Sequence, residues 1–319
     1  MIDMTVLVNQ LIQLFLIICT GYLVFKIGIL NENVNKHINS LVINVTMPFM
    51  IVSSVLSMTD RPAASTIISL FMVSIGYFII MPVLSFIIVK IMLKTMHIVK
   101  ARQGAYMFML IFSNVAFMGM PILQAACGEN GATAVFYAAV LNIFFNLSVF
   151  TYGVIIIGYG DTIETTLKLK DLLSPGILCS VLAIIIYAFN IHLPSTIEST
   201  IDTIGDLTSP LAMILVGSTL ASMELKEVFN EWRVYVFATV KQFILPILLY
   251  PVFRFCIEDD LLFNVMFIEF LMPIANIALM LATQYNLDNK FVSKTIFIST
   301  LMSLVSIPIV MYLCGMIYG

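Results

Sequence analysis

Charged residues are scarce in this 319-residue sequence, which contains 10% Asp, Glu, Lys and Arg against 61% hydrophobic residues. The formal net charge is only −3, so we expect no nucleic-acid partner. The mean hydropathy of +1.07 excludes an ordinary soluble globular domain. The composition therefore predicts an integral membrane protein.

Motifs of common metal and catalytic sites are also missing. The five cysteines lie in or beside apolar segments without CxxC or metal-like spacing, so we interpret them as core residues. No GxSxG, HExxH or paired-aspartate motif lies within an apolar segment. The sequence thus predicts no metal site and no enzymatic activity, and the 21 methionines are expected to be soft packing between helices.

Apolar runs of about 20 residues, the length of a helix that crosses a bilayer, recur along the chain. The N-terminus "MIDMTVLVNQ" has an acidic residue and no Lys or Arg before its apolar run, unlike a cleaved signal peptide, so the first run is expected to remain as a span. Polar joints such as "MTDRP" separate the runs. The predicted fold is an all-α integral membrane protein with ten transmembrane helices: Val6–Phe25, His37–Leu56, Ile67–Val89, Ala105–Cys127, Ala132–Ile157, Pro175–Ile191, Ile204–Met223, Val234–Cys256, Leu261–Tyr285 and Thr295–Ile317.

The basic residues indicate an orientation. Twelve Lys and Arg residues lie in the odd-numbered joints between these spans, whereas only Arg61 and Arg254 lie in the even-numbered joints and tails. Because cytoplasmic loops are enriched in Lys and Arg, the odd-numbered joints are expected in the cytoplasm. This pattern predicts a multi-pass protein of the cell membrane with both termini outside.

The chain divides into two halves, residues 1–157 and 175–319, joined by a short cytoplasmic linker at residues 158–174. Five spans in each half give the halves opposite orientations, as in transporters built from inverted repeats. Three prolines recur in the same order in corresponding spans: Pro48 with Pro210, Pro82 with Pro246, and Pro121 with Pro273. Prolines are common in membrane helices, which is the alternative explanation for any single pair, but the ordered set favours an inverted repeat.

Helix-breaking residues interrupt the fourth and ninth spans. The fourth contains "SNVAFMGMP", with Asn114, Gly119 and Pro121, and the ninth contains Pro273. At 1.5 Å per residue, Asn114 lies about 15 Å and Pro273 about 18 Å into its span, close to the bilayer midplane. Hydrocarbon offers no water to the backbone groups that a break frees, so breaks persist only beside protein or a wet cavity. We therefore predict that broken helices 4 and 9 cross at the midplane and form a substrate site.

The segments "TMPFMIVSSVL", "SNVAFMGMPIL", "SPLAMILVGSTL" and "MPIANIALMLATQYNLD" resemble signatures of the auxin efflux carrier family, in its short bacterial form often labelled malate or malonate permease. The resemblance covers essentially the whole chain. It implies two inverted five-helix repeats, a scaffold and a transport domain, and an elevator-like exchange of access. The plant members carry a long hydrophilic loop between the fifth and sixth spans that is absent here, so auxin is not implied as the substrate.

The predicted substrate-binding residues are Asn114, Gly119, Pro121, Asn142, Asn146, Pro273, Asn276, Thr46, Pro48, Thr208 and Ser209. Asn114 is the strongest candidate, and Asn276, three residues after Pro273, is its counterpart. The alternative for each amide is a hydrogen bond to a neighbouring helix. Asn142 and Asn146 lie one helical turn apart and share a face, with the same alternative.

The hydroxyl residues of this set have a second explanation. Thr46, Thr208 and Ser209 lie within two residues of Pro48 or Pro210. A hydroxyl at such a position can bond to the backbone that the proline opens, without any contact to a ligand.

Glu269 and Lys241 are the only charged residues deep within spans, where ionised side chains are costly and usually functional or paired. Three interpretations remain open: Lys241 extends to the cytoplasmic interface, the two residues form a structural ion pair, or Glu269 binds a coupling ion or proton. The stretch "IEFLMPIAN" resembles the segment by which bile-acid sodium symporters hold sodium through a glutamate, although a proline replaces the usual polar residue after the methionine. Sodium and the proton are thus the candidate coupling ions, and no other cofactor is expected.

Two function classes fit these features. The first is a carrier for small organic anions, most plausibly a monocarboxylate or a weakly held dicarboxylate, since no arginine lies at depth to clamp a carboxylate. The second is a membrane-embedded receptor on the same scaffold without net transport, which would lack a soluble output domain. Expected partners are the organic anion and membrane lipids, with a homodimer left open.

Overall fold

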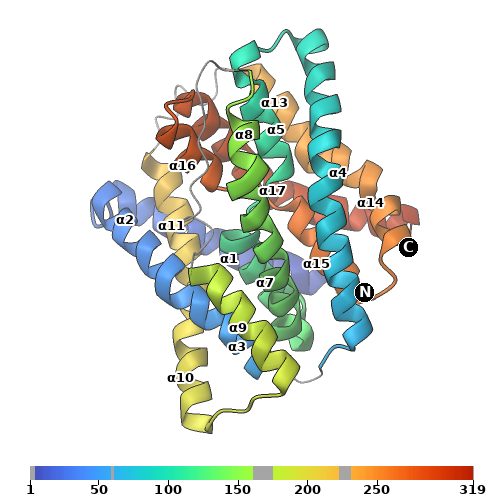
Figure 1. Cartoon of the computed structure of the whole chain (residues 1–319). Coiled ribbons are helices and arrows are strands. Elements are labelled where there is room, and N and C mark those ends of the chain that lie inside the picture. Colours follow the sequence, from blue (N-terminus) through green and yellow to red (C-terminus); the bar gives the residue numbers. More distant parts are fainter. Residues whose placement is uncertain (1–3, 59–60, 161–174, 223–230, 319) are drawn as a thin grey trace.

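The computed structural model describes residues 4–58, 61–160, 175–222 and 231–318, and within these ranges the chain is almost entirely helical (Figure 1). Most of the predicted linker and the end of the seventh predicted span lie outside the described residues. Each predicted span otherwise coincides with a helix or with a pair of consecutive helices.

The helices of the first half are α1 (Met4–Lys26), α2 (Glu32–Leu41), α3 (Met47–Leu56), α4 (Ala64–Met96), α5 (Gln103–Ile111), α6 (Met120–Ala126), α7 (Gly131–Ser148) and α8 (Val154–Ile157). Those of the second half are α9 (Pro175–Phe189), α10 (Ser195–Asp206), α11 (Thr208–Ser222), α13 (Trp232–Thr239), α14 (Leu245–Cys256), α15 (Asp260–Leu271), α16 (Ile277–Gln284) and α17 (Asn289–Tyr318). Within the described residues, four π-helical turns lie between consecutive helices, at Val42–Thr46, Val115–Gly119, Val149–Gly153 and Val240–Ile244.

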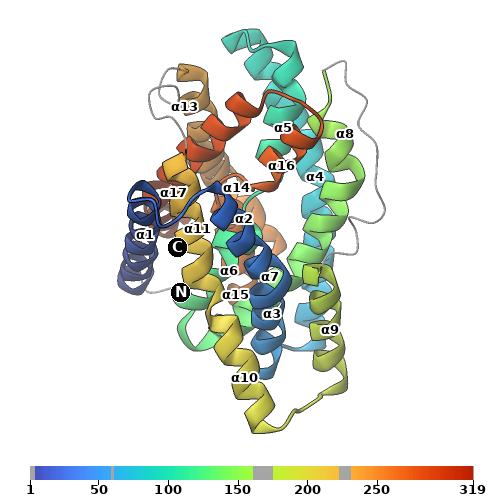
Figure 2. The ribbon, with the colours of Figure 1, turned by 90° about the vertical axis from the view of Figure 1, so that its left-hand side faces the viewer.

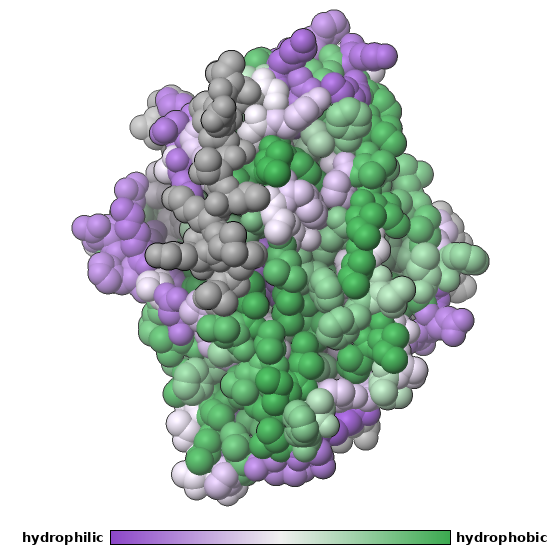
Figure 3. Space-filling model, viewed as in Figure 1, coloured by the Kyte–Doolittle hydropathy of each residue, from purple (hydrophilic) through white to green (hydrophobic). Residues whose placement is uncertain are grey.

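The molecule has the surface of a membrane protein. In its described part, 6 helical stretches are long and apolar enough to cross a bilayer, and shorter apolar helices accompany them. On α4, Met72, Ile79 and Ile80 are each more than 60% exposed, which suits contact with lipid rather than water. Figure 3 shows hydrophobic residues over the middle of one face and hydrophilic residues towards its ends.

Helices of the two halves pack against each other reciprocally. Helix α1 lies along α11, and α9 lies along α3 (Figure 2). Glycines allow the first contact, because a Cβ on Gly21 would lie 2.2 Å from the carbonyl oxygen of Ile214, and one on Gly217 would lie 1.9 Å from that of Ile18. The α1–α11 interface is therefore one of direct backbone contact.

Polar side chains reinforce the same reciprocal arrangement at the short amphipathic helices. The Ser218 hydroxyl of α11 donates to Asn35 of α2 at 2.8 Å. In the other direction, Ser53 of α3 and Ser57, the residue after α3, both donate to the Asp202 carboxylate of α10, Ser57 at 3.0 Å. Each half thus contributes one amphipathic helix that is hydrogen-bonded to a more apolar segment of the other half.

Pro121 does not break the fourth predicted span, which corrects the sequence-based interpretation. It lies in the first turn of α6, directly after the π turn Val115–Gly119. Pro121 has no amide hydrogen to donate to the preceding turn. The π turn accommodates this, because the amide of Met120 bonds to the carbonyl of Val115, five residues back. The helix is interrupted earlier, where residues 112–114 are non-helical between α5 and the π turn.

Other prolines follow the same pattern or leave their helix intact. Pro48 and Pro246 each lie in the first turn of a helix that follows a π turn. Pro82 lies inside the continuous helix α4. Pro273, by contrast, lies in the non-helical gap between α15 and α16, as predicted for the ninth span.

Candidate functional site

The two helix interruptions pair with each other. The amide of Asn114 donates to the carbonyl of Pro273 at 2.7 Å, and the amide of Ala275 donates to the carbonyl of Phe112 at 3.1 Å. These bonds form an antiparallel β-bridge centred on Ser113 and Ile274. Each break therefore satisfies the backbone groups that the other exposes, which is what an apolar environment requires. We call residues 112–114 and 273–275 the crossing.

Asn114 and Asn276 occupy matching positions beside the crossing. Asn114 is the N-cap residue of the π turn that leads into α6, and Asn276 is the N-cap residue of α16. Neither side chain makes the usual hydrogen bond to its own helix. The Asn114 side chain is buried and that of Asn276 is half-buried. Both amides thus lie at the starts of half-helices, where the helix dipole favours a negative group.

Gly119 is required by the position of Glu269. A Cβ at residue 119 would lie 2.1 Å from Oε2 of Glu269, so the carboxyl group lies directly against the backbone of the π turn. Glu269 is only 2% exposed. Neither of its oxygens has a hydrogen-bond partner within the described residues. A carboxyl group in this state is an uncompensated buried polar group.

Lys241 reaches the crossing. It lies on the π turn Val240–Ile244, is 2% exposed, and donates from Nζ to the Ser113 hydroxyl at 2.9 Å. The interpretation in which Lys241 extends to the cytoplasmic interface is therefore wrong, because its amino group is buried and donates to Ser113 in the interior. A direct Lys241–Glu269 ion pair is also absent among the ion pairs of the described residues.

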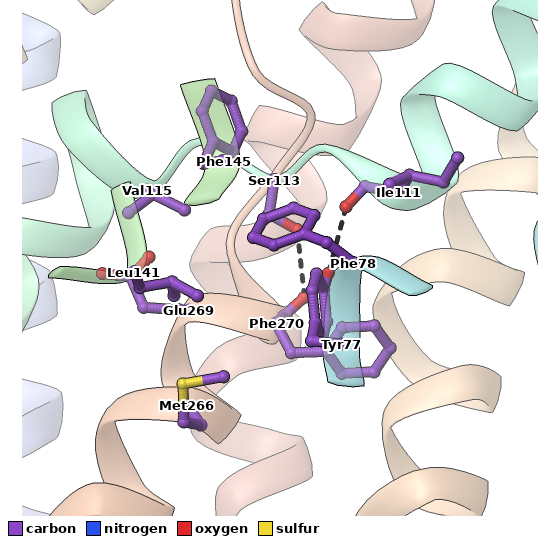
Figure 4. Close-up of a pocket in the computed structure, with 10 residues that line it drawn as sticks. All are labelled: Tyr77, Phe78, Ile111, Ser113, Val115, Leu141, Phe145, Met266, Glu269 and Phe270. Carbon is purple, nitrogen blue, oxygen red and sulfur yellow. Dashed lines mark hydrogen bonds between the residues drawn. The ribbon is translucent and has the colours of Figure 1, made fainter. Parts of the chain in front are cut away.

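A small cavity adjoins these groups (Figure 4). Its volume of about 10 Å³ is roughly what one water molecule needs. Ser113, Glu269 and Tyr77 supply its polar groups, and the Tyr77 hydroxyl already donates to the carbonyl of Ile111 at 3.0 Å. The other lining residues are Phe78, Ile111, Val115, Leu141, Phe145, Met266 and Phe270. In this conformation the cavity is too small for an organic acid.

Asn142 and Asn146 share one face of α7, as predicted, and are bonded to each other. The Asn146 amide donates to Oδ1 of Asn142 at 3.1 Å and to the Asn142 carbonyl at 2.7 Å. Helix α7 packs against α15, α6 and the π turn Val115–Gly119. Leu141, next to Asn142, lines the cavity. The pair therefore lies on a helix that borders the crossing.

The hydroxyl residues near Pro48 and Pro210 do not belong to the cavity beside the crossing. Thr46 and Thr208 are buried, and neither hydroxyl has a partner within the described residues. They do not bond to the backbone near the prolines, contrary to the alternative interpretation of these threonines. Neither they nor the half-buried Ser209 line the cavity.

An ionic cluster that the sequence did not indicate joins three segments at one end of the molecule. Arg102, before α5, pairs with Glu231 at 2.5 Å and with Asp288 at 2.7 Å, and lies over the Phe291 ring. Burial alone would lower the pKa of the Arg102 guanidinium, but the two carboxylates outweigh it and raise the pKa. Arg102 thus connects α5 to the starts of α13 and α17.

Ser113 is the site residue that sequence reasoning missed. Its position directly before Asn114, in a helix-breaking stretch, could have indicated a role at the site. A serine within a membrane span, however, is usually a packing residue. No group of three or more His, Cys, Asp or Glu side chains within the described ranges is arranged to hold a metal ion.

Comparisons with known proteins identify the family of this chain. The chain matches the membrane transport protein family over residues 6–160 and 160–311. It is 28% identical to an uncharacterized transporter of Methanocaldococcus jannaschii, over 97% of this chain and 98% of that protein. It is 25% identical to an uncharacterized transporter of Methanothermobacter thermautotrophicus, over 94% of this chain and 96% of that protein. The chain therefore belongs to the membrane transport protein family, the auxin efflux carrier family that its motifs resemble, and is a multi-pass membrane transporter rather than an enzyme.

Proposed function

We propose that this transporter is a secondary-type carrier for small organic anions and that its substrate site is the crossing. The observation that carries this proposal is the backbone hydrogen bond between Asn114 and Pro273. It brings together the starts of two half-helices, each with an N-cap asparagine whose side chain makes no hydrogen bond to its own helix. Paired discontinuous helices are a recurring substrate site of secondary transporters.

The chemistry of the crossing suits an anion. Two half-helix starts contribute partial positive charge, the asparagine side chains can donate hydrogen bonds, and the Lys241 ammonium lies at Ser113. Arginine, which would clamp two carboxylates firmly, does not border the cavity. A monocarboxylate therefore fits better than a tightly held dicarboxylate, with Asn142 and Asn146 as further ligands from α7.

Two inverted five-helix repeats of ten spans, residues 1–157 and 175–319, form the proposed architecture, with 158–174 as the cytoplasmic linker and both termini outside the cell membrane. Four features support it. The α1–α11 and α9–α3 contacts are reciprocal, each half contains one interrupted helix, and the two interruptions meet. The matching N-cap positions of Asn114 and Asn276 are the fourth.

Transport then requires a change of conformation, because the present cavity holds about one water molecule. We propose an elevator-like movement in which the helices of the crossing slide against the remaining helices. The glycine-mediated α1–α11 contact is a suitable rigid element for such a movement, since close backbone packing resists deformation.

Uptake of labelled carboxylates into proteoliposomes tests the site. We expect the Asn114→Ala variant to lose at least about 90% of uptake, and the exposed Asn44→Ala variant to keep it. Unchanged uptake by the Asn114 variant would reject the site. A receptor on the same scaffold would instead show ligand-dependent thermal stabilisation by an organic acid without any uptake.

A further inference from the structure

We propose that Glu269 and Lys241 form a proton-coupling site, in which Glu269 carries one proton with each monocarboxylate anion bound near Lys241. This inference rests on the proposed carrier function and specifies its coupling ion. It starts from two ionisable side chains, Glu269 and Lys241, that are buried beside the crossing.

Glu269 is placed to be neutral in this conformation. Both oxygens lack hydrogen-bond partners within the described residues, and the side chain is 2% exposed beside Val115, Met266 and Phe270. An ionised carboxylate in such surroundings would lose its hydration without compensation. A bound proton removes that cost.

A metal cation is a poorer occupant than a proton. A sodium ion needs several oxygen ligands, whereas the crossing carbonyls of Phe112, Asn114 and Pro273 already accept backbone hydrogen bonds. The Lys241 ammonium at Ser113 also repels a cation from the cavity. The Glu269 carboxyl group and the Ser113 hydroxyl are enough to hold a proton, but they are too few to form the coordination shell of a sodium ion.

The proton site is connected to Lys241 through Ser113. Ser113 accepts the hydrogen bond of Lys241 and lines the same water-sized cavity as Glu269. Tyr77 of α4 is the other titratable side chain in the lining, and its hydroxyl is engaged by Ile111. The remaining titratable groups on the described helices packed against α15, which do not line the cavity, include Tyr137 on α7, Tyr250 on α14 and Cys314 on α17.

The charges balance over a transport cycle. Glu269 takes a proton from water on one side, which leaves the Lys241 ammonium free to bind one carboxylate anion, so the loaded site has no net charge. After the anion leaves on the other side, Glu269 releases its proton to water and its carboxylate becomes the counter-charge of Lys241 for the return. Each cycle therefore moves one anion and one proton, and no net charge.

Gradient-driven uptake and exchange of labelled lactate in proteoliposomes test the coupling, with protein-free liposomes as the diffusion background. We expect an inward proton gradient, but not a sodium gradient, to drive accumulation by the unaltered protein. Glu269→Gln, which mimics the protonated acid, should lose accumulation at least tenfold while retaining lactate exchange, which needs no proton release. The exposed Glu258→Gln variant is the matched control and should behave as the unaltered protein.

Proton-driven accumulation by the Glu269→Gln variant, or accumulation driven by sodium, would overturn the proposal. Infrared spectroscopy separates this failure from a failure of the carrier function, because it needs no transport. The unaltered protein should show a protonated-carboxyl band that the Glu269→Gln variant lacks. Absence of that band refutes the proton site even if lactate moves, whereas presence of the band with no entry or exchange refutes only lactate transport.

Discussion

The amide of Asn114 donates a 2.7 Å hydrogen bond to the carbonyl of Pro273, 159 residues later in the chain (273 − 114). This single bond joins the two helix interruptions, and the Ala275–Phe112 bond completes the pairing. Side chains that depend on the crossing should therefore affect transport more than stability, whereas helix contacts elsewhere should affect stability more than transport.

Gly119→Ala should disturb the site directly. The added methyl group would lie 2.1 Å from the Glu269 carboxyl, so the carboxyl group or the π turn must move. We expect about 1–3 kcal/mol of destabilisation from overpacking and at least a tenfold loss of uptake. Gly76→Ala on α4 is the matched control, because its methyl group would meet nothing within 4 Å and should raise stability slightly. Equal uptake by the two variants would contradict the proposed closeness of Gly119 and Glu269.

Ser113→Ala should leave the Lys241 ammonium without its acceptor. A buried donor without a partner costs about 1–3 kcal/mol, and the anion site loses the group that holds the lysine in place. We expect a severalfold rise in the substrate concentration for half-maximal uptake. Ser74→Ala is the control, because the Ser74 hydroxyl is buried without a partner and its removal should be neutral or stabilising. Similar kinetics in both variants would argue against a role for Ser113.

The sequence predicted the helical membrane class and the gap at Pro273, but it misplaced the break in the fourth span. Pro121 is a local breaker whose effect the π turn absorbs, whereas Phe112 and Ser113 have no intrinsic reason to leave a helix. They are extended because residues 273–275 pair with them, and such a long-range partner cannot be read from local composition. The acceptor of Lys241 could not be predicted for the same reason, since Ser113 lies on another segment.

Gly217→Ala should test the close packing of α1 on α11. The methyl group would lie 1.9 Å from the carbonyl oxygen of Ile18, a backbone atom that cannot rotate away. We expect the helices to separate, with a loss of about 1–3 kcal/mol measured as a lower Tm in detergent. Gly315→Ala, whose methyl group meets nothing within 4 Å, should keep the Tm. If the Gly217 variant melts like the Gly315 variant, α1 and α11 are not in backbone contact.

Arg102→Ala should loosen one end of the molecule without changing the crossing. Arg102 holds Glu231 and Asp288, and Asp288 also accepts the amide of Phe291 at the start of α17. Because the two carboxylates raise the pKa of the guanidinium, a rise of pH within the working range does not remove its charge, and substitution is the cleaner test. If the cluster restrains the movement of α5 against α13 and α17, its removal should lower the free energy of unfolding by about 1 kcal/mol, measured as a lower Tm, and raise the exchange rate of bound carboxylate. The exposed Lys94→Ala variant removes one positive charge nearby in sequence without an ion pair and should change neither quantity. A slower exchange rate in the Arg102 variant would instead mean that the cluster stabilises the transition between conformations rather than this one.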